Sequence, residues 1–286
     1  MDKPDQRPIE PTVDYLHRPQ LSDGTMIMAF SGWMDGGDVS TGTVQRLIRL
    51  LEPTPFAEIN PEPFYIYNFP GSMELTAIFR PHIRIEEGLI TAVDMPSNTF
   101  YVHDESSVVL FVGKEPNLKW RAFGEAIFDV ARATGIRRLL FVGSFGGPVP
   151  HTRLPRLYYT CSDSNLRKGM EDYGLRATDY EGPGSFISYL MSRAKEAGLE
   201  MTSVIAEIPG YLQGENPMCI EAVTRQLAKI LQLPLDLESL RPASTAWELQ
   251  VTTAIEEDEE LAEKVRELEN EFDNELIQSD SDGGDG

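Results

Sequence analysis

The chain contains few cysteines and few histidines. Its 286 residues include two cysteines, Cys161 and Cys219, and four histidines. Two isolated cysteines form neither a disulfide framework nor a Cys-x-x-Cys motif, which favours a reducing compartment. No His-Glu-x-x-His motif or His–carboxylate cluster accompanies the histidines. The sequence therefore predicts no metal site, no cofactor and no catalytic residue.

Long apolar runs are also missing. No stretch approaches the roughly 20 apolar residues that cross a bilayer. Residues 1–20 are polar and contain four prolines, unlike a secretory signal peptide. We therefore expect a cytoplasmic protein with no membrane partner.

Basic residues are outnumbered by acidic ones. The 25 Lys and Arg residues face 46 Asp and Glu residues, which gives a net charge of -21. The electrostatic field of this negative charge repels phosphate backbones, so nucleic acid is not expected as a partner. The charge is uneven: residues 256–286 carry 14 acidic and 2 basic residues, a net of -12, which leaves -9 for the first 255 residues.

Four short apolar runs are rich in β-forming residues. They are Met26–Phe30, Ser107–Val112, Arg138–Val142 and Ser203–Ala206. Continuous apolarity is typical of strands buried on both faces, as in a parallel sheet. Apolar residues at helical spacing occur in residues 44–51, 120–130, 187–194 and 220–231. This alternation predicts a three-layer αβα sandwich with a mostly parallel sheet.

Residues 52–106 have a different pattern. Short β-like pieces at Phe64–Tyr67, His82–Glu86 and Thr99–His103 alternate with Pro, Gly and Asn. We interpret them as antiparallel hairpins or an inserted sheet. The predicted organisation is a polar segment (1–22), an α/β domain (23–252), an acidic amphipathic helix (253–279) and a disordered tail (280–286).

The acidic helix carries one apolar stripe. It is predicted to begin near Thr253, where Thr253-x-x-Glu256 resembles a capping box. Its apolar residues recur every three or four positions, and an isolated helix of this length is marginal in water. We expect the stripe to pack on the body or on a neighbouring subunit; a solvated acidic tail is the alternative. The stripe residues are Leu261, Val265, Leu268 and Phe272.

Two glycine-rich loops follow predicted strands. The first contains Ser31, Gly32 and Asp35 and either binds an anion at a helix N-terminus or forms a tight turn with Asp38 as the helix cap. The second, around Gly146 and Gly147, lacks the Gly-x-Ser-x-Gly pattern that would make Ser144 a nucleophile.

Charged and aromatic residues follow these loops. After the second loop, His151 and Arg153 either hold a carboxylate or phosphate in a cleft, or they form a structural salt bridge or cap a helix end. Glu181 precedes a predicted helix, and Tyr211 follows the fourth strand. Both are included in the candidate cleft, although Glu181 is equally explained by the helix dipole.

Taken together, these segments resemble the PAC2 family, the proteasome assembly chaperone 2-like proteins. The similar blocks are Phe30-Ser31-Gly32-Trp33-x-Asp35, Gly113-x-Glu115-Pro116, Pro150-His151-Thr152-Arg153, Glu181-Gly182-Pro183-Gly184 and Ile208-Pro209-x-Tyr211. The resemblance extends from about residue 26 to residue 240. It rests on the order and spacing of the blocks together.

The resemblance implies a nucleoside-phosphorylase-like fold, homo-oligomers and protein partners, because relatives act as chaperones of proteasome α-subunits. Some archaeal relatives end in a hydrophobic–Tyr–x motif, which residues 282–286 do not contain. Two hypotheses follow: a non-catalytic assembly chaperone or scaffold, or an enzyme or small-molecule binder with a phosphorylase- or hydrolase-like cleft. Fold similarity alone cannot separate them.

Overall fold

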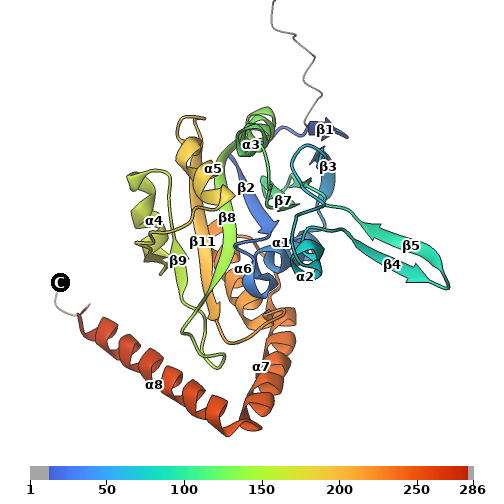
Figure 1. Ribbon diagram of the computed structural model, residues 1–286. Coiled ribbons are helices and arrows are strands. Elements are labelled where there is room, and N and C mark those ends of the chain that lie inside the picture. The colour runs from blue at the N-terminus through green and yellow to red at the C-terminus, as the bar shows by residue number, and fades with distance from the viewer. Residues whose placement is uncertain (1–12, 283–286) are drawn as a thin grey trace, which may run out of the picture.

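The protein is an α/β protein with a nine-stranded mixed sheet packed by helices (Figure 1). The computed structural model describes residues 13–282. In spatial order the strands are β1 (Val13–Tyr15), β3 (Thr54–Ile59), β6 (Thr99–His103), β7 (Val108–Lys114), β2 (Gly24–Ser31), β8 (Ile136–Gly147), β11 (Glu200–Pro209), β9 (Leu157–Tyr159) and β10 (Arg176–Ala177).

All four apolar runs form strands at the centre of this sheet. β7, β2, β8 and β11 are adjacent and parallel. The prediction of a mostly parallel sheet is wrong for the sheet as a whole, because four of the eight strand pairings described are antiparallel. The antiparallel strands lie towards the edges, where partly buried residues give no continuous apolar run.

Helices cover both faces of the sheet. On β2, Ile27 and Ala29 point to the layer of α1 (Val39–Leu51) and α6 (Pro217–Leu231). Met26, Met28 and Phe30 point to the layer of α3 (Trp120–Thr134) and α5 (Phe186–Ala194). Because both faces are covered, every residue from Met26 to Phe30 is buried, which explains the uninterrupted apolar sequence.

Residues 52–106 form antiparallel structure, as predicted. β3 pairs with β6 and β6 with β7, while β4 (His82–Glu86) and β5 (Leu89–Asp94) form a separate hairpin that extends away from the body (Figure 1). The predicted strand at Phe64–Tyr67 is wrong. Phe64 is buried against Phe123, and its carbonyl accepts hydrogen bonds from residues 117 and 118, so its apolarity serves core packing in a turn.

The remaining helices connect or flank the sheet. They are α2 (Met73–Ala77), α4 (Arg167–Asp172), α7 (Arg241–Glu256), α8 (Glu259–Asp282) and the 3-10 turns η1 (Gly36–Asp38), η2 (Ser164–Leu166) and η3 (Glu238–Leu240). α7 and α8 meet in a V below the sheet in Figure 1.

The acid-rich C-terminal helix begins later than the sequence suggests. Thr253 lies inside α7, where its hydroxyl donates to the carbonyl of Leu249. Asp258 instead caps α8, because its carboxylate accepts a hydrogen bond from the Leu261 N–H. Residues 1–12 of the predicted N-terminal segment and 283–286 of the predicted tail lie outside the described residues.

Candidate functional site

The loop after β2 is fastened to the end of β8. The Ser144 hydroxyl donates to the Gly36 carbonyl at 2.6 Å, and the Ser144 N–H donates to the Met34 carbonyl at 2.8 Å. Gly37 and Asp38 both adopt left-handed backbone conformations, which a tight strand-to-helix turn requires. Ser144 therefore holds the loop in place. This structural role agrees with the sequence, which lacks the pattern expected around a nucleophilic serine.

Asp35, and not Asp38, supports the start of α1. Its carboxylate accepts hydrogen bonds from the Thr41 N–H at 3.0 Å and from the Thr41 hydroxyl at 2.8 Å. Asp38 is exposed and makes no side-chain capping bond. Burial raises the pKa of Asp35 to about 6, although the hydrogen bonds from Thr41 act to lower it.

This pKa predicts a measurable pH dependence. Because the folded-state pKa of Asp35 lies above the unfolded value of about 3.9, the stabilising effect of protonating it is present below pH 4 and lost as the pH rises through 6. We expect the free energy of unfolding of Asp35→Asn to equal that of the wild type at pH 4 and to be about 1–2 kcal/mol higher at pH 7.5. This difference is smaller than the full pKa shift would give, because the carboxyl is only partly buried. Urea unfolding from pH 4 to 7.5 measures this difference; a constant difference at every pH would contradict the prediction.

Glu115 links two segments that lie far apart in the sequence. One carboxylate oxygen accepts the Trp33 N–H at 3.1 Å, and the other accepts the Phe186 N–H at the start of α5 at 2.8 Å. Gly32, with φ of 141°, lies against Glu115, where an added Cβ would sit 3.0 Å from its side chain. Sequence reasoning did not include Glu115 in the cleft, although an acidic residue directly after a buried strand is a usable signal.

Glu181 does not join the other candidate residues. It lies exposed in the loop before α5, while Ser185 caps that helix and Glu115 accepts from its first N–H. The structure thus places Ser31 at the end of β2, Gly32 and Asp35 on the loop that follows it, and Glu181 on another loop.

His151 and Tyr211 form a closed group with α7. His151 is 2% exposed; its Nδ1 lies 2.8 Å from the Tyr211 hydroxyl, and its Nε2 lies 3.0 Å from the Thr252 hydroxyl. The same Tyr211 oxygen accepts the His151 N–H at 2.9 Å. Burial lowers the pKa of His151, which favours a neutral imidazole at neutral pH. Both ring nitrogens are therefore engaged by the protein's own hydroxyl groups.

Arg153 pairs with α8. Its Nε and Nη2 atoms each donate to the Asp273 carboxylate at 2.9 Å, and its Nη1 lies 3.5 Å from the Glu269 carboxylate. Thr152 also donates a hydrogen bond to Glu269. The bidentate bond from Arg153 holds the pKa of Asp273 below its ordinary value.

Arg156 is a second connection to α8. Its guanidinium donates to Glu207 at 3.2 Å and to Glu275 at 2.6 Å, and it lies 4.2 Å from the centre of the Phe272 ring. The side chains of Arg156 and Glu207 are only 8% and 4% exposed. We call this group the arginine clasp; it comprises Arg153, Arg156, Glu207, Glu269, Phe272, Asp273 and Glu275. Sequence reasoning placed only Arg153 and Phe272 among the functional candidates.

The predicted stripe of the C-terminal helix is unevenly covered. Val265 and Phe272 are 5% and 4% exposed, whereas Leu261 and Leu268 are half-buried. The last two residues of β8, Gly146 and Gly147, lie next to the clasp: Gly147 leaves room for the Glu207 side chain, and its carbonyl accepts the Gly210 N–H at 3.0 Å. An added Cβ at Gly146 would meet Gly210 at 3.4 Å.

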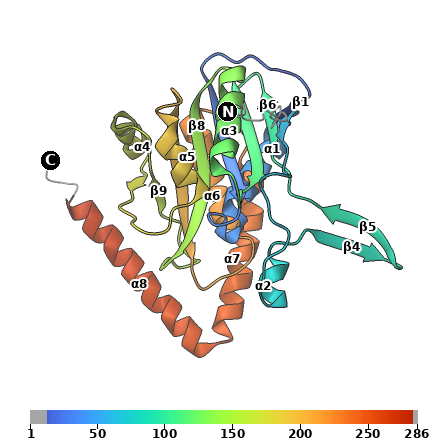
Figure 2. The same ribbon diagram turned by 45° about the horizontal axis from the view of Figure 1, so that its top comes forward.

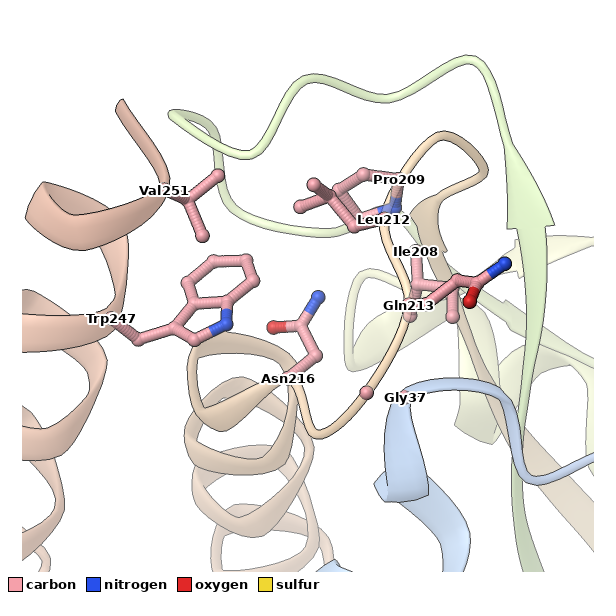
Figure 3. Close-up of a pocket in the computed structure, with 9 residues that line it drawn as sticks. Gly37, Ile208, Pro209, Leu212, Gln213, Asn216, Trp247 and Val251 are labelled. Atoms are coloured by element: carbon pink, nitrogen blue, oxygen red, sulfur yellow. The ribbon is translucent and has the colours of Figure 1, made fainter. Parts of the chain in front are cut away.

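Two hollows of different size lie near these residues. Figure 3 shows the smaller, a cavity of about 40 Å³ between α7 and the loops after β2 and β11, where Trp247 and Val251 face Pro209 and Leu212. That volume holds a water molecule or two and no metabolite. The larger is an open hollow of about 570 Å³ beside the clasp, lined in part by Arg153, Arg156, Arg176 and Tyr173.

Within residues 13–282, no group of three His, Cys, Asp or Glu side chains is arranged to hold a metal ion. Over the same residues, no helix is both long and apolar enough to cross a bilayer.

Residues 29–255 match the PAC2 family, and the chain belongs to that family. A proteasome-assembly chaperone homologue from Mycobacterium tuberculosis is 28% identical over 84% of this chain and 99% of its own, with a TM-score of 0.72. A PAC2 family protein from Streptomyces avermitilis is 27% identical over 85% of this chain and 100% of its own, with a TM-score of 0.71.

A third structure shares the fold. A Mycobacterium tuberculosis protein of unknown function is 23% identical, covers 96% of this chain and 94% of its own, and has a TM-score of 0.84. Among curated proteins, none matches the sequence significantly.

Proposed function

We propose that this protein is a cytoplasmic, non-catalytic assembly chaperone or scaffold that binds protein partners through an oligomeric, three-layer α/β domain of nucleoside-phosphorylase type. The observation that carries the proposal is the closure of the His151–Arg153 region by the chain itself. Side chains of α7 and α8 occupy the hydrogen-bonding positions that a bound carboxylate or phosphate would need. Family membership and the relative named as a proteasome-assembly chaperone homologue support protein partners.

The test compares ligand binding with partner binding on the full-length protein. We expect a panel of phosphate- and carboxylate-bearing metabolites to leave the melting temperature unchanged. A metabolite that did bind would be detected, because a ligand at 100 times its dissociation constant stabilises the fold by about 2.7 kcal/mol. We also expect a pull-down with the full-length protein to capture a protein partner. That partner, once purified, should form a complex of fixed stoichiometry with this protein. A metabolite that raises the melting temperature, together with failure to rebuild any complex, would contradict the proposal.

The open hollow beside the clasp favours a second candidate function, the binding of a small anionic molecule. Three arginines line it in a chain of net charge -21, and its volume of about 570 Å³ falls in the range of metabolite sites. Arg153 and Arg156 are already paired with carboxylates, so Arg176 would carry the recognition. Arg176→Ala should abolish any anion-induced thermal shift, while Arg193→Ala, which removes a surface arginine from α5, should leave it intact.

A further inference from the structure

The C-terminal helix α8 touches the body along a narrow line. Val265 and Phe272 are the only buried side chains among those that the structure describes on this helix of 24 residues. By comparison, α3 buries eight of its 15 residues. In Figures 1 and 2, α8 diverges from α7 below the sheet and runs outwards on the side of β9 and α4. α8 is therefore held by far less apolar packing than a helix of the core.

The joint between α7 and α8 allows α8 to move by itself. α7 ends at Glu256 and α8 begins at Glu259, so residues 257 and 258 form the joint. The cap of α8 is local, because the Asp258 carboxylate accepts the Leu261 N–H at 3.1 Å. Segments with few buried apolar contacts open at a lower free energy than the whole fold, so α8 can detach while the body stays folded.

The body holds its two clasp arginines partly through its own residues. The Arg156 guanidinium donates to Glu207 of β11 at 3.2 Å, and Gly147 leaves room for the Glu207 side chain. Arg153 Nη1 donates to the hydroxyl of its neighbour Thr152 at 3.1 Å. These contacts lie within the body, so they continue to orient both guanidinium groups when α8 leaves.

α8 meets these arginines with an aromatic ring flanked by carboxylates. The Phe272 ring centre lies 4.2 Å from the Arg156 guanidinium. Asp273, the next residue, accepts two hydrogen bonds from Arg153 at 2.9 Å. Glu275 accepts one from Arg156 at 2.6 Å. The surface beneath α8 therefore accepts an acidic helix that presents an aromatic side chain.

The same surface continues beyond α8. The open hollow of about 570 Å³ beside Phe272 is also lined by Leu154 and Arg176. Leu154 stays 67% exposed with α8 in place. An occupant that covers Leu154 gains apolar contact that α8 lacks, and a carboxylate placed at Arg176 adds charge pairing. Because a bound segment shifts an equilibrium by its difference in affinity for the two states, such an occupant displaces α8.

We propose that the surface beneath α8, formed by Arg153, Leu154, Arg156 and Arg176, binds an acidic amphipathic helix of a partner protein, and that α8 covers it as an internal competitor. Charge complementarity argues for this occupant: α8, the helix seated there, carries ten acidic and two basic residues. An amphipathic helix docked on such a surface is a recurring mode of peptide recognition. The inference rests on the proposed function and deepens it, because it names the segment that the chaperone or scaffold recognises and the contact that regulates recognition.

Fluorescence anisotropy of a labelled peptide with the sequence of residues 259–282 tests this surface on the full-length protein. The wild type should bind the peptide weakly, because its own α8 covers the surface. Phe272→Ala should bind it about tenfold more tightly or better, because apparent affinity rises with the fraction of molecules whose surface is free. Asp273→Asn/Glu275→Gln should act in the same direction without removing apolar volume. Ile277→Ala is the matched control, because Ile277 is 68% exposed on the same helix, and it should bind like the wild type.

Equal affinity of Phe272→Ala and the wild type, or no binding by either, would overturn the inference. Two further measurements assign the binding to this surface. Adding Arg153→Glu to Phe272→Ala should abolish the gain in affinity, and a peptide that carries Phe272→Ala should not bind. Persistence of the gain with Arg153→Glu would place the peptide elsewhere and refute the proposal. A wild-type dimer that dissociates in Phe272→Ala would assign the surface to α8 of a second copy, which also refutes it.

The purified protein partner separates this inference from the proposed function. The partner should bind Phe272→Ala more tightly than the wild type, and excess peptide of residues 259–282 should compete with it. A partner that binds both proteins equally and ignores the peptide refutes this inference and leaves the proposed chaperone function standing. If no partner forms a complex, the proposed function fails, and the peptide measurement still decides this inference.

Discussion

Arg156→Met should lower the free energy of unfolding by about 3 kcal/mol or more. Arg156 and Glu207 are 8% and 4% exposed, and their charged groups lie 3.2 Å apart. Methionine fills much of the same space but leaves the Glu207 carboxylate buried without its cation, and removing one member of a buried ion pair is strongly destabilising. Chemical denaturation followed by fluorescence and circular dichroism measures the change.

Two further variants separate charge burial from packing. Arg156→Met/Glu207→Gln should recover most of the lost stability, because no buried ionised group then remains unpaired. Glu275→Gln should cost less than about 1 kcal/mol, because that carboxylate is 59% exposed and solvent screens it. Equal losses in Arg156→Met and in the double variant would show that packing, and not the buried charge, sets the effect.

Phe272→Ala should release α8 from the body. Phe272 is 4% exposed and its ring lies under the Arg156 guanidinium, so truncation removes both a buried aromatic side chain and a cation–π contact. We expect a loss of about 3 kcal/mol at most, because α8 can detach without unfolding the sheet. Once detached, α8 loses the packing of its apolar face, which supplies most of a helix's stability in a protein, and helicity should fall.

Limited proteolysis reports this release directly. In Phe272→Ala, cleavage should begin within residues 259–278, while the body stays intact. Ile277→Ala is the matched control, because Ile277 lies on the same helix but is 68% exposed, and it should be cleaved like the wild type. Wild-type resistance in Phe272→Ala would contradict the docking role predicted for the apolar stripe.

The central fold could be predicted because its signal is local. The runs Met26–Phe30 and, apart from its first residue, Arg138–Val142 are buried on both faces, so their composition alone indicates β2 and β8. The edges of the sheet were harder to predict: Phe64–Tyr67 has strand-like composition, yet Phe64 packs into the core from a turn. The hairpin strand His82–Glu86 was predicted at its observed bounds, but its separation from the main sheet depends on pairings that periodicity does not encode.

The arginine clasp shows why the candidate site was only partly predictable. Arg156 meets Glu207 and Glu275 across 51 and 119 residues of sequence. The sequence shows many acidic residues on the C-terminal helix but does not indicate which of them form salt bridges with the arginines of the body. One local signal was available: Glu269 and Asp273 are four residues apart, beside Phe272, and therefore lie on one side of the helix.

α8 lies on the body and closes the region of Arg153 and Arg156. Hydrogen–deuterium exchange of the full-length protein at neutral pH tests it most directly. Peptides covering residues 265–273 should exchange as slowly as those of α7, and protection should fall in Phe272→Ala. Exchange of these peptides at the rate of an unfolded chain in the wild type would contradict the account.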